Sequence, residues 1–174
     1  MRTVLLLAAL VLVLVGGGLL YGGTFTQNFI KDQLTAQKIK FPAESELKAQ
    51  GRDDLVKYAA ETVDTGPEAK AYASFIEGHL AKVANGQSYS EVSAAYLKDK
   101  TNTTLEAQRQ QLFMGEMLRG TLLNVWGWSI VGTIATYSAI AAWVMAIALL
   151  AIFMLLIEPR KKTAKKTNKS SKRK

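Results

Sequence analysis

The chain has 174 residues, no cysteine, one histidine and a net charge of +8 at neutral pH. This length allows one modest domain, and the lack of cysteine excludes disulfides, a thiol nucleophile and cysteine-based metal sites. A single histidine also excludes an iron site of the two-histidine facial type.

The charged residues are sorted along the chain. No Lys, Arg, Asp or Glu occurs from Thr3 to Ile30 or from Gly120 to Ile157. An uncharged apolar run of about 18 residues or more indicates a membrane-spanning helix, because about 20 helical residues cross the hydrocarbon core. The sequence therefore predicts an all-α protein with two antiparallel transmembrane helices and a small helical domain between them.

Residues 4–25 are predicted to form the first transmembrane helix, after a cytoplasmic N-terminus at residues 1–3. A cleaved signal peptide is the alternative, because Arg2 precedes an apolar stretch of suitable length. That stretch continues through Tyr21 without an Ala-X-Ala-like cleavage site, which favours a retained anchor. Gly18 and Gly22 lie four residues apart, a spacing that lets helices approach closely in lipid.

Residues 26–125 are predicted to form an extracytoplasmic domain of four to five short helices. Capping boxes, in which Glu follows Ser or Thr after three residues, mark three helix starts. They are Thr65/Glu68, Ser88/Glu91 and Thr103/Glu106. No stretch alternates with a period of two, so we expect no sheet. A domain of this size buries a marginal core, so we expect it to pack also against the spans or a partner.

Turn residues divide the first part of this domain. The helix that continues the first span should end before Pro42, and Gly51 is well placed to end a short helix over residues 43–50. Asp53 is expected to cap a further helix that runs to about Val63. His79 follows on the next helix, where a lone histidine is expected to be packed and hydrogen-bonded without a chemical role.

Residues 126–157 are predicted to hold the second transmembrane helix together with an outer interfacial segment. The whole uncharged stretch from Gly120 would be about 57 Å long as a helix, against a hydrocarbon core of about 30 Å. A connector or an interfacial turn is therefore expected at residues 120–124.

Aromatic and small residues suggest how this second span is placed. Aromatic side chains at a membrane surface are predicted at Trp126, Trp128 and Tyr137. The alternative is that the two tryptophans pack in the soluble domain. Ala135 and Ala139 are expected to face Gly18 and Gly22 within one chain, and a homodimer through the same small residues is the alternative.

Residues 158–174 form a basic tail with a net charge of +8, whereas residues 31–119 carry a net charge of −1. Cytoplasmic flanks of spans carry the excess of Lys and Arg. Both termini are therefore predicted to be cytoplasmic, in a multi-pass protein of the plasma membrane. Residues predicted to bind anionic lipid headgroups are Arg160, Lys161, Lys162, Lys165 and Lys166. Nucleic-acid binding is not expected, because the tail adjoins the membrane and contains no aromatic residue.

Nothing in the sequence indicates a reaction. The chain contains no G-x-S-x-G elbow, phosphate-binding Walker loop or G-x-G-x-x-G turn. Its paired carboxylates lie at expected helix N-termini, where the helix dipole favours them without any catalytic role. Neither span contains a charged residue, which argues against an ion-coupled transporter. We expect no enzyme activity, no catalytic or metal-binding residue and no cofactor.

Two segments of the middle domain carry a resemblance. Residues 72–80 and 86–93, together with the two-span layout, resemble a family of small actinobacterial membrane proteins without an established activity. The resemblance implies a bacterial plasma membrane and implies no reaction. Some members are labelled as aromatic ring-opening dioxygenases, a chemistry for which this chain has too few metal ligands.

Two functions remain open at this point. The first is a non-enzymatic accessory or scaffold subunit of a larger complex in the plasma membrane. The second is an extracytoplasmic ligand-binding or sensing module anchored by two spans.

Overall fold

The computed structural model describes residues 2–157, so Met1 and residues 158–174 lie outside the described part. Its helices are α1 (Arg2–Gln37), α2 (Glu44–Ala49), the 3-10 helix η1 (Asp53–Tyr58), α3 (Gly66–Val83), α4 (Tyr89–Lys98) and α5 (Thr103–Ile157). Within residues 2–157 no strand forms, and a single isolated bridge joins Lys40 and Thr62. The predicted all-α class is confirmed.

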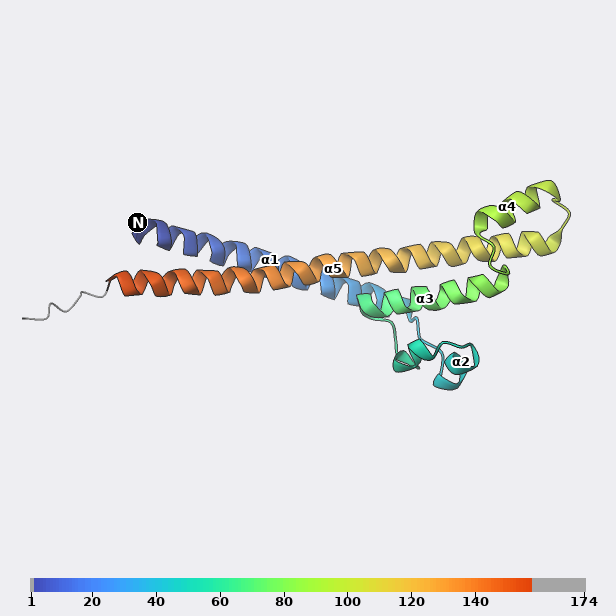
Figure 1. Cartoon of the computed structure of the whole chain (residues 1–174), viewed down its shortest axis with the longest axis horizontal. Helices are drawn as coiled ribbons and strands as arrows, with labels where there is room; N and C mark the ends of the chain where they lie inside the picture. The colour runs from blue at the N-terminus through green and yellow to red at the C-terminus, as the bar shows by residue number, and fades with distance from the viewer. Residues whose placement is uncertain (1, 158–174) are drawn as a thin grey trace, which may run out of the picture.

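The longest element is α5, with 55 residues, and it runs along the whole length of the molecule (Figure 1). The start of α1 lies beside the end of α5. Further along the contact, the Trp143 indole donates a hydrogen bond to the Val13 carbonyl at 3.3 Å. The Gln27 amide then donates to the Ser129 carbonyl at 2.8 Å. Residue numbers therefore rise along one helix as they fall along the other.

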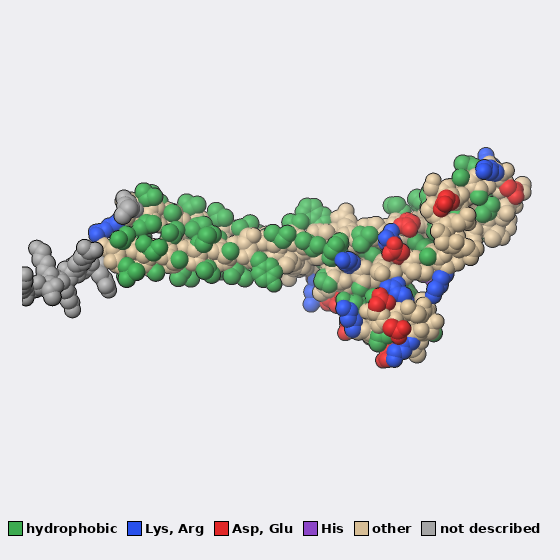
Figure 2. Space-filling view, in the orientation of Figure 1, with side chains coloured by type: hydrophobic (Ala, Val, Ile, Leu, Met, Phe, Trp, Pro, Cys, Tyr) green, Lys and Arg blue, Asp and Glu red, His purple; other side chains and the backbone are tan. Residues whose placement is uncertain are grey.

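The molecule has two chemically different halves (Figure 2). Charged side chains gather over the end of α1, α2, η1, α3, α4 and the first part of α5, which we call the charged half. The rest of α1 and α5 shows almost only hydrophobic side chains and is called the apolar half. Both helices are long and apolar enough to cross a membrane, and only 11% and 17% of their most apolar windows are buried within the protein.

The expected break at residues 120–124 is wrong, because α5 continues through them as one helix. Leu122 is only 1% exposed, and Val125 is partly buried in the same hydrophobic cluster. These residues lie beside α1 and α3 inside the charged half. The uncharged stretch is longer than one membrane crossing because its first part belongs to this core.

The core of the charged half is shared between the small helices and the two long ones. It includes Ile30 and Leu34 from α1, Leu112 and Leu122 from α5, and Ala69, Ala73, Ile76 and Leu80 from α3. The small helices therefore complete their core on the extensions of α1 and α5, as the modest size of the domain led us to expect.

Two of the three capping boxes form as predicted. The Thr65 hydroxyl accepts from the Glu68 backbone N–H while the Glu68 carboxylate accepts from the Thr65 N–H, and Ser88 and Glu91 pair in the same way. The third prediction is wrong. The Asn102 side chain accepts from the Leu105 N–H at 3.1 Å, so this residue caps α5. The helix therefore starts one residue after its cap, with Thr103 already in its first turn.

The prediction of a helix from Asp53 to Val63 is also wrong. Only η1 forms, and Arg52 occupies the position before it. After η1, Ala60 takes a φ of 60° and its N–H donates to the Pro42 carbonyl at 3.1 Å. The chain therefore turns back to pair with the segment that follows α1, and this pairing ends the helical conformation.

Loss of the α3 cap should destabilise the charged half. Thr65→Ala removes the hydroxyl that accepts from the first turn, so the free energy of unfolding should fall by about 1 kcal/mol. Thr104→Ala, at an exposed position in the first turn of α5, is the control and should change it by less than about 0.5 kcal/mol. Denaturation of the full chain in detergent, followed by circular dichroism, measures both. Equal losses would contradict the role of the cap.

Candidate functional site

The contact between α1 and α5 in the apolar half is built from small residues. Their positions recur every seven residues on both helices, which keeps them on one face. The buried residues at these positions are Ala9, Gly16 and Gly23 on α1 and Gly132, Ala139 and Ala146 on α5, and Ala142 is buried beside them. We call the six residues at these positions the small-residue seam. Small residues let helix backbones approach closely, which favours association in lipid.

At two glycines of the seam, atoms of the facing helix occupy the space that a side chain would need. A Cβ atom added at Gly23 would lie 2.7 Å from the Gly132 carbonyl oxygen and would also overlap the Thr136 hydroxyl. A Cβ atom at Gly16 would lie 2.5 Å from two atoms of the Trp143 indole. Gly16 therefore makes room for this indole. The sequence analysis did not identify Gly16 or Gly23 as packing residues.

The predicted packing glycines lie elsewhere. Gly18 and Gly22 are exposed, and a Cβ atom at either would meet no atom within 4 Å. Ala139 is fully buried in the seam, whereas Ala135 is only partly buried. The prediction that Gly18 and Gly22 face α5 is therefore wrong. Spacing by four shows that two small residues share a face, but it does not say which face meets the other helix.

Three helices meet at Ser129, where the apolar half joins the charged half. The Gln27 amide of α1 donates to the Ser129 carbonyl and, at 3.1 Å, to the Thr133 hydroxyl. From α3, Gly66 packs so closely on the Ser129 side chain that a Cβ atom at this glycine would overlap it. Ser129 is 4% exposed and its hydroxyl donates to the Trp126 carbonyl. Polar bonds thus fix the helices where the seam ends.

The three predicted interfacial aromatics have different surroundings. Trp126 belongs to the folded charged half, because the Lys70 ammonium lies 4.1 Å from its ring centroid. Trp128 and Tyr137 are 59% and 69% exposed. Their position at a membrane surface stays a prediction.

An apolar groove lies beside Trp128 where the two halves join. It has a volume of about 330 Å³ and is lined by residues of α1 and α5: Phe25, Thr26, Phe29, Ile30, Gln33, Val125 and Trp128. Tyr21, Phe25 and Phe29 stack in a row along α1, with ring centroids 6.3 and 6.2 Å apart. We call this the boundary groove.

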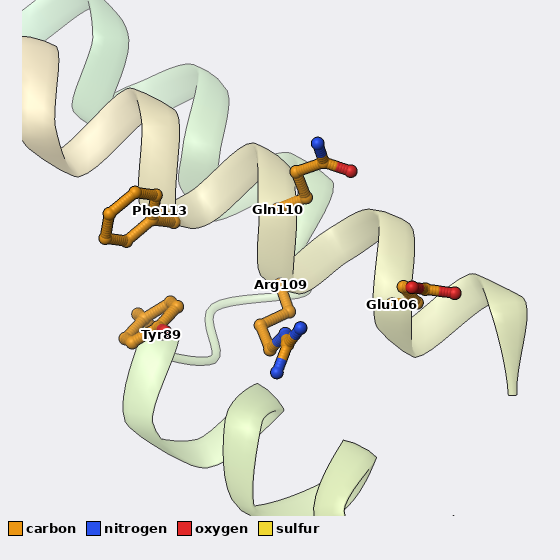
Figure 3. A pocket seen from close by; sticks show the side chains of 5 residues that line it. All are labelled: Tyr89, Glu106, Arg109, Gln110 and Phe113. Atoms are coloured by element: carbon orange, nitrogen blue, oxygen red, sulfur yellow. The ribbon is translucent and has the colours of Figure 1, made fainter. Parts of the chain in front are cut away.

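A second groove lies between α4 and α5 at the far end of the charged half (Figure 3). It has a volume of about 410 Å³ and is lined by Tyr89, Glu106, Arg109, Gln110 and Phe113. The Arg109 guanidinium points from α5 towards α4 and lies 4.3 Å from the Tyr96 ring centroid. We call this the distal groove.

Two carboxylates in the first turns of helices, Asp54 of η1 and Glu91 of α4, have hydrogen-bond partners. The hydrogen bond from Arg52 holds the pKa of Asp54 below its usual value. Bonds from the Ser88 backbone N–H and hydroxyl lower the pKa of Glu91 in the same sense. Because both folded-state pKa values are lowered, these contacts stabilise the fold above the unfolded pKa values, and this stabilisation is lost as the pH falls.

His79 is exposed, which contradicts the expectation that it is packed.

Within residues 2–157 no three His, Asp or Glu side chains gather as a metal site would require. The predicted headgroup-binding residues of the basic tail lie outside the described residues.

No family model, curated protein or solved structure matches the chain. The resemblance to actinobacterial two-span proteins therefore stays a prediction.

Proposed function

We propose that the protein is a non-enzymatic integral protein of the plasma membrane and an accessory or scaffold subunit of a membrane complex. In this proposal α1 and α5 cross the membrane antiparallel to each other through the apolar half. The charged half stands outside the cytoplasm, and both termini lie inside. Arg2 and the basic tail support this orientation, because Lys and Arg are enriched on cytoplasmic flanks.

The lengths of the two helices agree with a single crossing each. Residues 4–25 of α1 have a helical length of about 33 Å. Because α3 packs on Ser129, the span of α5 would begin after that residue, and residues 130–156 are about 40 Å long. A bilayer measures about 30 Å across its hydrocarbon core and about 40–45 Å with its headgroup regions.

Exposed apolar side chains in the charged half are the observation that carries the role as a subunit. They project from α5 at Phe113, Met114, Met117 and Leu118, which are 52%, 56%, 60% and 39% exposed. Clustered apolar residues on a surface outside the membrane mark interaction sites. Methionine is well suited to such a surface because its flexible side chain adapts to a partner.

A double substitution, Met114→Glu with Met117→Glu, should release the partner. The tagged full chain would be purified from its native cells in mild detergent, and co-purifying proteins would be quantified by mass spectrometry. We expect about a tenfold loss, because burying these charges opposes docking by at least about 1.4 kcal/mol. Gln111→Glu adds one charge at a nearby exposed position and should keep the partner. Recovery of the wild-type chain alone would contradict the proposal.

The orientation has its own test. The variants Lys70→Cys and Lys169→Cys place single thiols in the charged half and in the basic tail. On intact cells an impermeant thiol reagent should label the first and not the second, because only the charged half faces outward in the proposal. The opposite pattern would reverse the orientation, and permeabilised cells give the control in which both are labelled.

The boundary groove favours the second function, an extracytoplasmic ligand-binding or sensing module. Its apolar lining joins α1 to α5, so an occupant would contact both helices that continue into the apolar half. Mass spectrometry of small molecules released from the purified protein distinguishes the two functions. A stoichiometric ligand that is lost in Trp128→Ala supports sensing, whereas a protein partner supports the accessory role. The alternative assembly is a homodimer through the exposed Gly18 and Gly22.

A further inference from the structure

The distal groove contains a cation without a counter-ion in the described chain. Among residues 2–157, no carboxylate forms an ion pair with Arg109. Glu106, one turn away on α5, also lines the groove but points away from this guanidinium (Figure 3). The Tyr96 ring supports one face of the guanidinium, which leaves its N–H edge available. Such an edge binds a carboxylate through two parallel hydrogen bonds.

An exposed aromatic pair lies beside this cation. Tyr89 at the start of α4 and Phe113 on α5 have ring centroids 5.9 Å apart and an interplanar angle of 47°. They are 40% and 52% exposed. Phe113 follows Arg109 by four residues, so it lies about one helical turn, or about 6 Å, further along α5. An apolar side chain of a partner can therefore contact the rings while its neighbour reaches the guanidinium.

A second hollow shares Tyr89 with the distal groove and is negatively charged. This hollow has a volume of about 490 Å³, and its lining includes Tyr89, Glu77 and Glu116. Both glutamates bind Arg119, at 2.8 and 3.2 Å, so these three groups carry a net charge of −1. Glu116 lies about 10 Å along α5 from Arg109. In the combined trough the Arg109 guanidinium, which has no ion pair, and Glu106 lie at one end, the aromatic pair lies in the middle, and the negatively charged hollow lies at the other end.

We infer that this trough binds a segment of a partner protein that carries a carboxylate close to an apolar residue. A carboxylate of the segment pairs with Arg109, and an apolar side chain about one helical turn away lies on Tyr89 and Phe113. The charge order favours a basic residue beyond the apolar one, near Glu116. A protein segment fits better than a small carboxylate because the trough extends over about 10 Å. The exposed Met114 and Met117 also continue the apolar surface beyond it. This inference rests on the proposed accessory role and specifies the chemistry of the partner.

Site-specific photocrosslinking in native cells tests this inference. A benzophenone amino acid replaces Gln110, which lines the groove, and the crosslinked peptide is sequenced by mass spectrometry. The attached segment should contain Asp or Glu within about one helical turn of an apolar residue. Arg109→Gln should lower the yield about tenfold, because a charge-assisted bidentate contact is lost. Arg109→Lys keeps the charge and should retain an intermediate yield.

Controls separate this contact from folding. Lys98→Gln removes an exposed cation from the end of α4 and should leave the yield unchanged. Circular dichroism must give the same helix content for every variant. Arg109→Glu should abolish crosslinking, and reversing the identified partner carboxylate to Arg should restore it.

Different results overturn different claims. A yield that does not depend on Arg109, an attached segment without a carboxylate, or a lipid or small carboxylate as the adduct would overturn the inference. The accessory role is still supported in that case if the recovery of a partner in the purification experiment depends on Met114 and Met117. If no partner is recovered in either experiment, both claims fail.

Discussion

Replacing Gly23 with leucine should force α1 and α5 apart, whereas the same replacement at the neighbouring Gly22 should leave their contact intact. At Gly23 even a Cβ atom would lie 2.7 Å from the Gly132 carbonyl oxygen and would overlap Thr136. The carbonyl belongs to the backbone, so no change of rotamer can make room. At Gly22 no atom lies within 4 Å of an added Cβ atom. The two variants therefore have the same composition, but only Gly23→Leu is predicted to destabilise the fold.

We expect Gly23→Leu to lower the free energy of unfolding by about 3 kcal/mol, at the upper end of the range for overpacking. Gly22→Leu should change it by less than about 0.5 kcal/mol. Unfolding of the full chain in mixed detergent micelles, followed by circular dichroism, measures both values. Equal effects would mean that the small-residue seam is wrongly placed. If chemical crosslinking traps a dimer of the wild-type chain and Gly22→Leu abolishes that crosslinking while the chain stays folded, the exposed glycine face joins two copies.

Gly66→Ala should detach the start of α3 from α5, although alanine normally strengthens a helix. Its Cβ atom would overlap both the Cβ and the hydroxyl oxygen of Ser129. Overpacking of this kind costs about 1–3 kcal/mol, which exceeds the gain of about 0.5–1 kcal/mol from replacing glycine in a helix. Gly127→Ala is the control, because an added Cβ atom there meets no atom within 4 Å.

A second substitution makes this prediction specific. Ser129→Gly removes both overlapping atoms, and the nearest remaining atom is the Trp126 Cα, 3.6 Å from the new Cβ atom. The double variant should therefore be more stable than the sum of the two single changes predicts, by at least about 1 kcal/mol in a double-mutant cycle. Additive losses would show that Gly66 and Ser129 do not contact each other in this way.

The distal groove could not be derived from the sequence. Arg109 and Phe113 lie on one helix, but Tyr89 and Tyr96 lie on another, and the turn between α4 and α5 decides which faces meet. The sequence identified Thr65 and Ser88 as caps because a cap depends on a few consecutive residues. The prediction that Thr103 caps α5 was wrong because the side chain of Asn102, one residue earlier, accepts from an N–H group of the first turn.

The sequence by itself determined the all-α class, the two long apolar helices and the separation of charged from uncharged segments. Periodicity, helix caps and charge act within a single stretch of chain, so they can be read from it directly. Only the tertiary structure decided that α5 is unbroken, that Leu122 belongs to a core, and that Gly16 and Gly23, rather than Gly18 and Gly22, face α5. The choice among several small-residue faces depends on how two helices fit along their whole length. That fit is a property of both surfaces together, because each close approach at one glycine sets the register for every other contact.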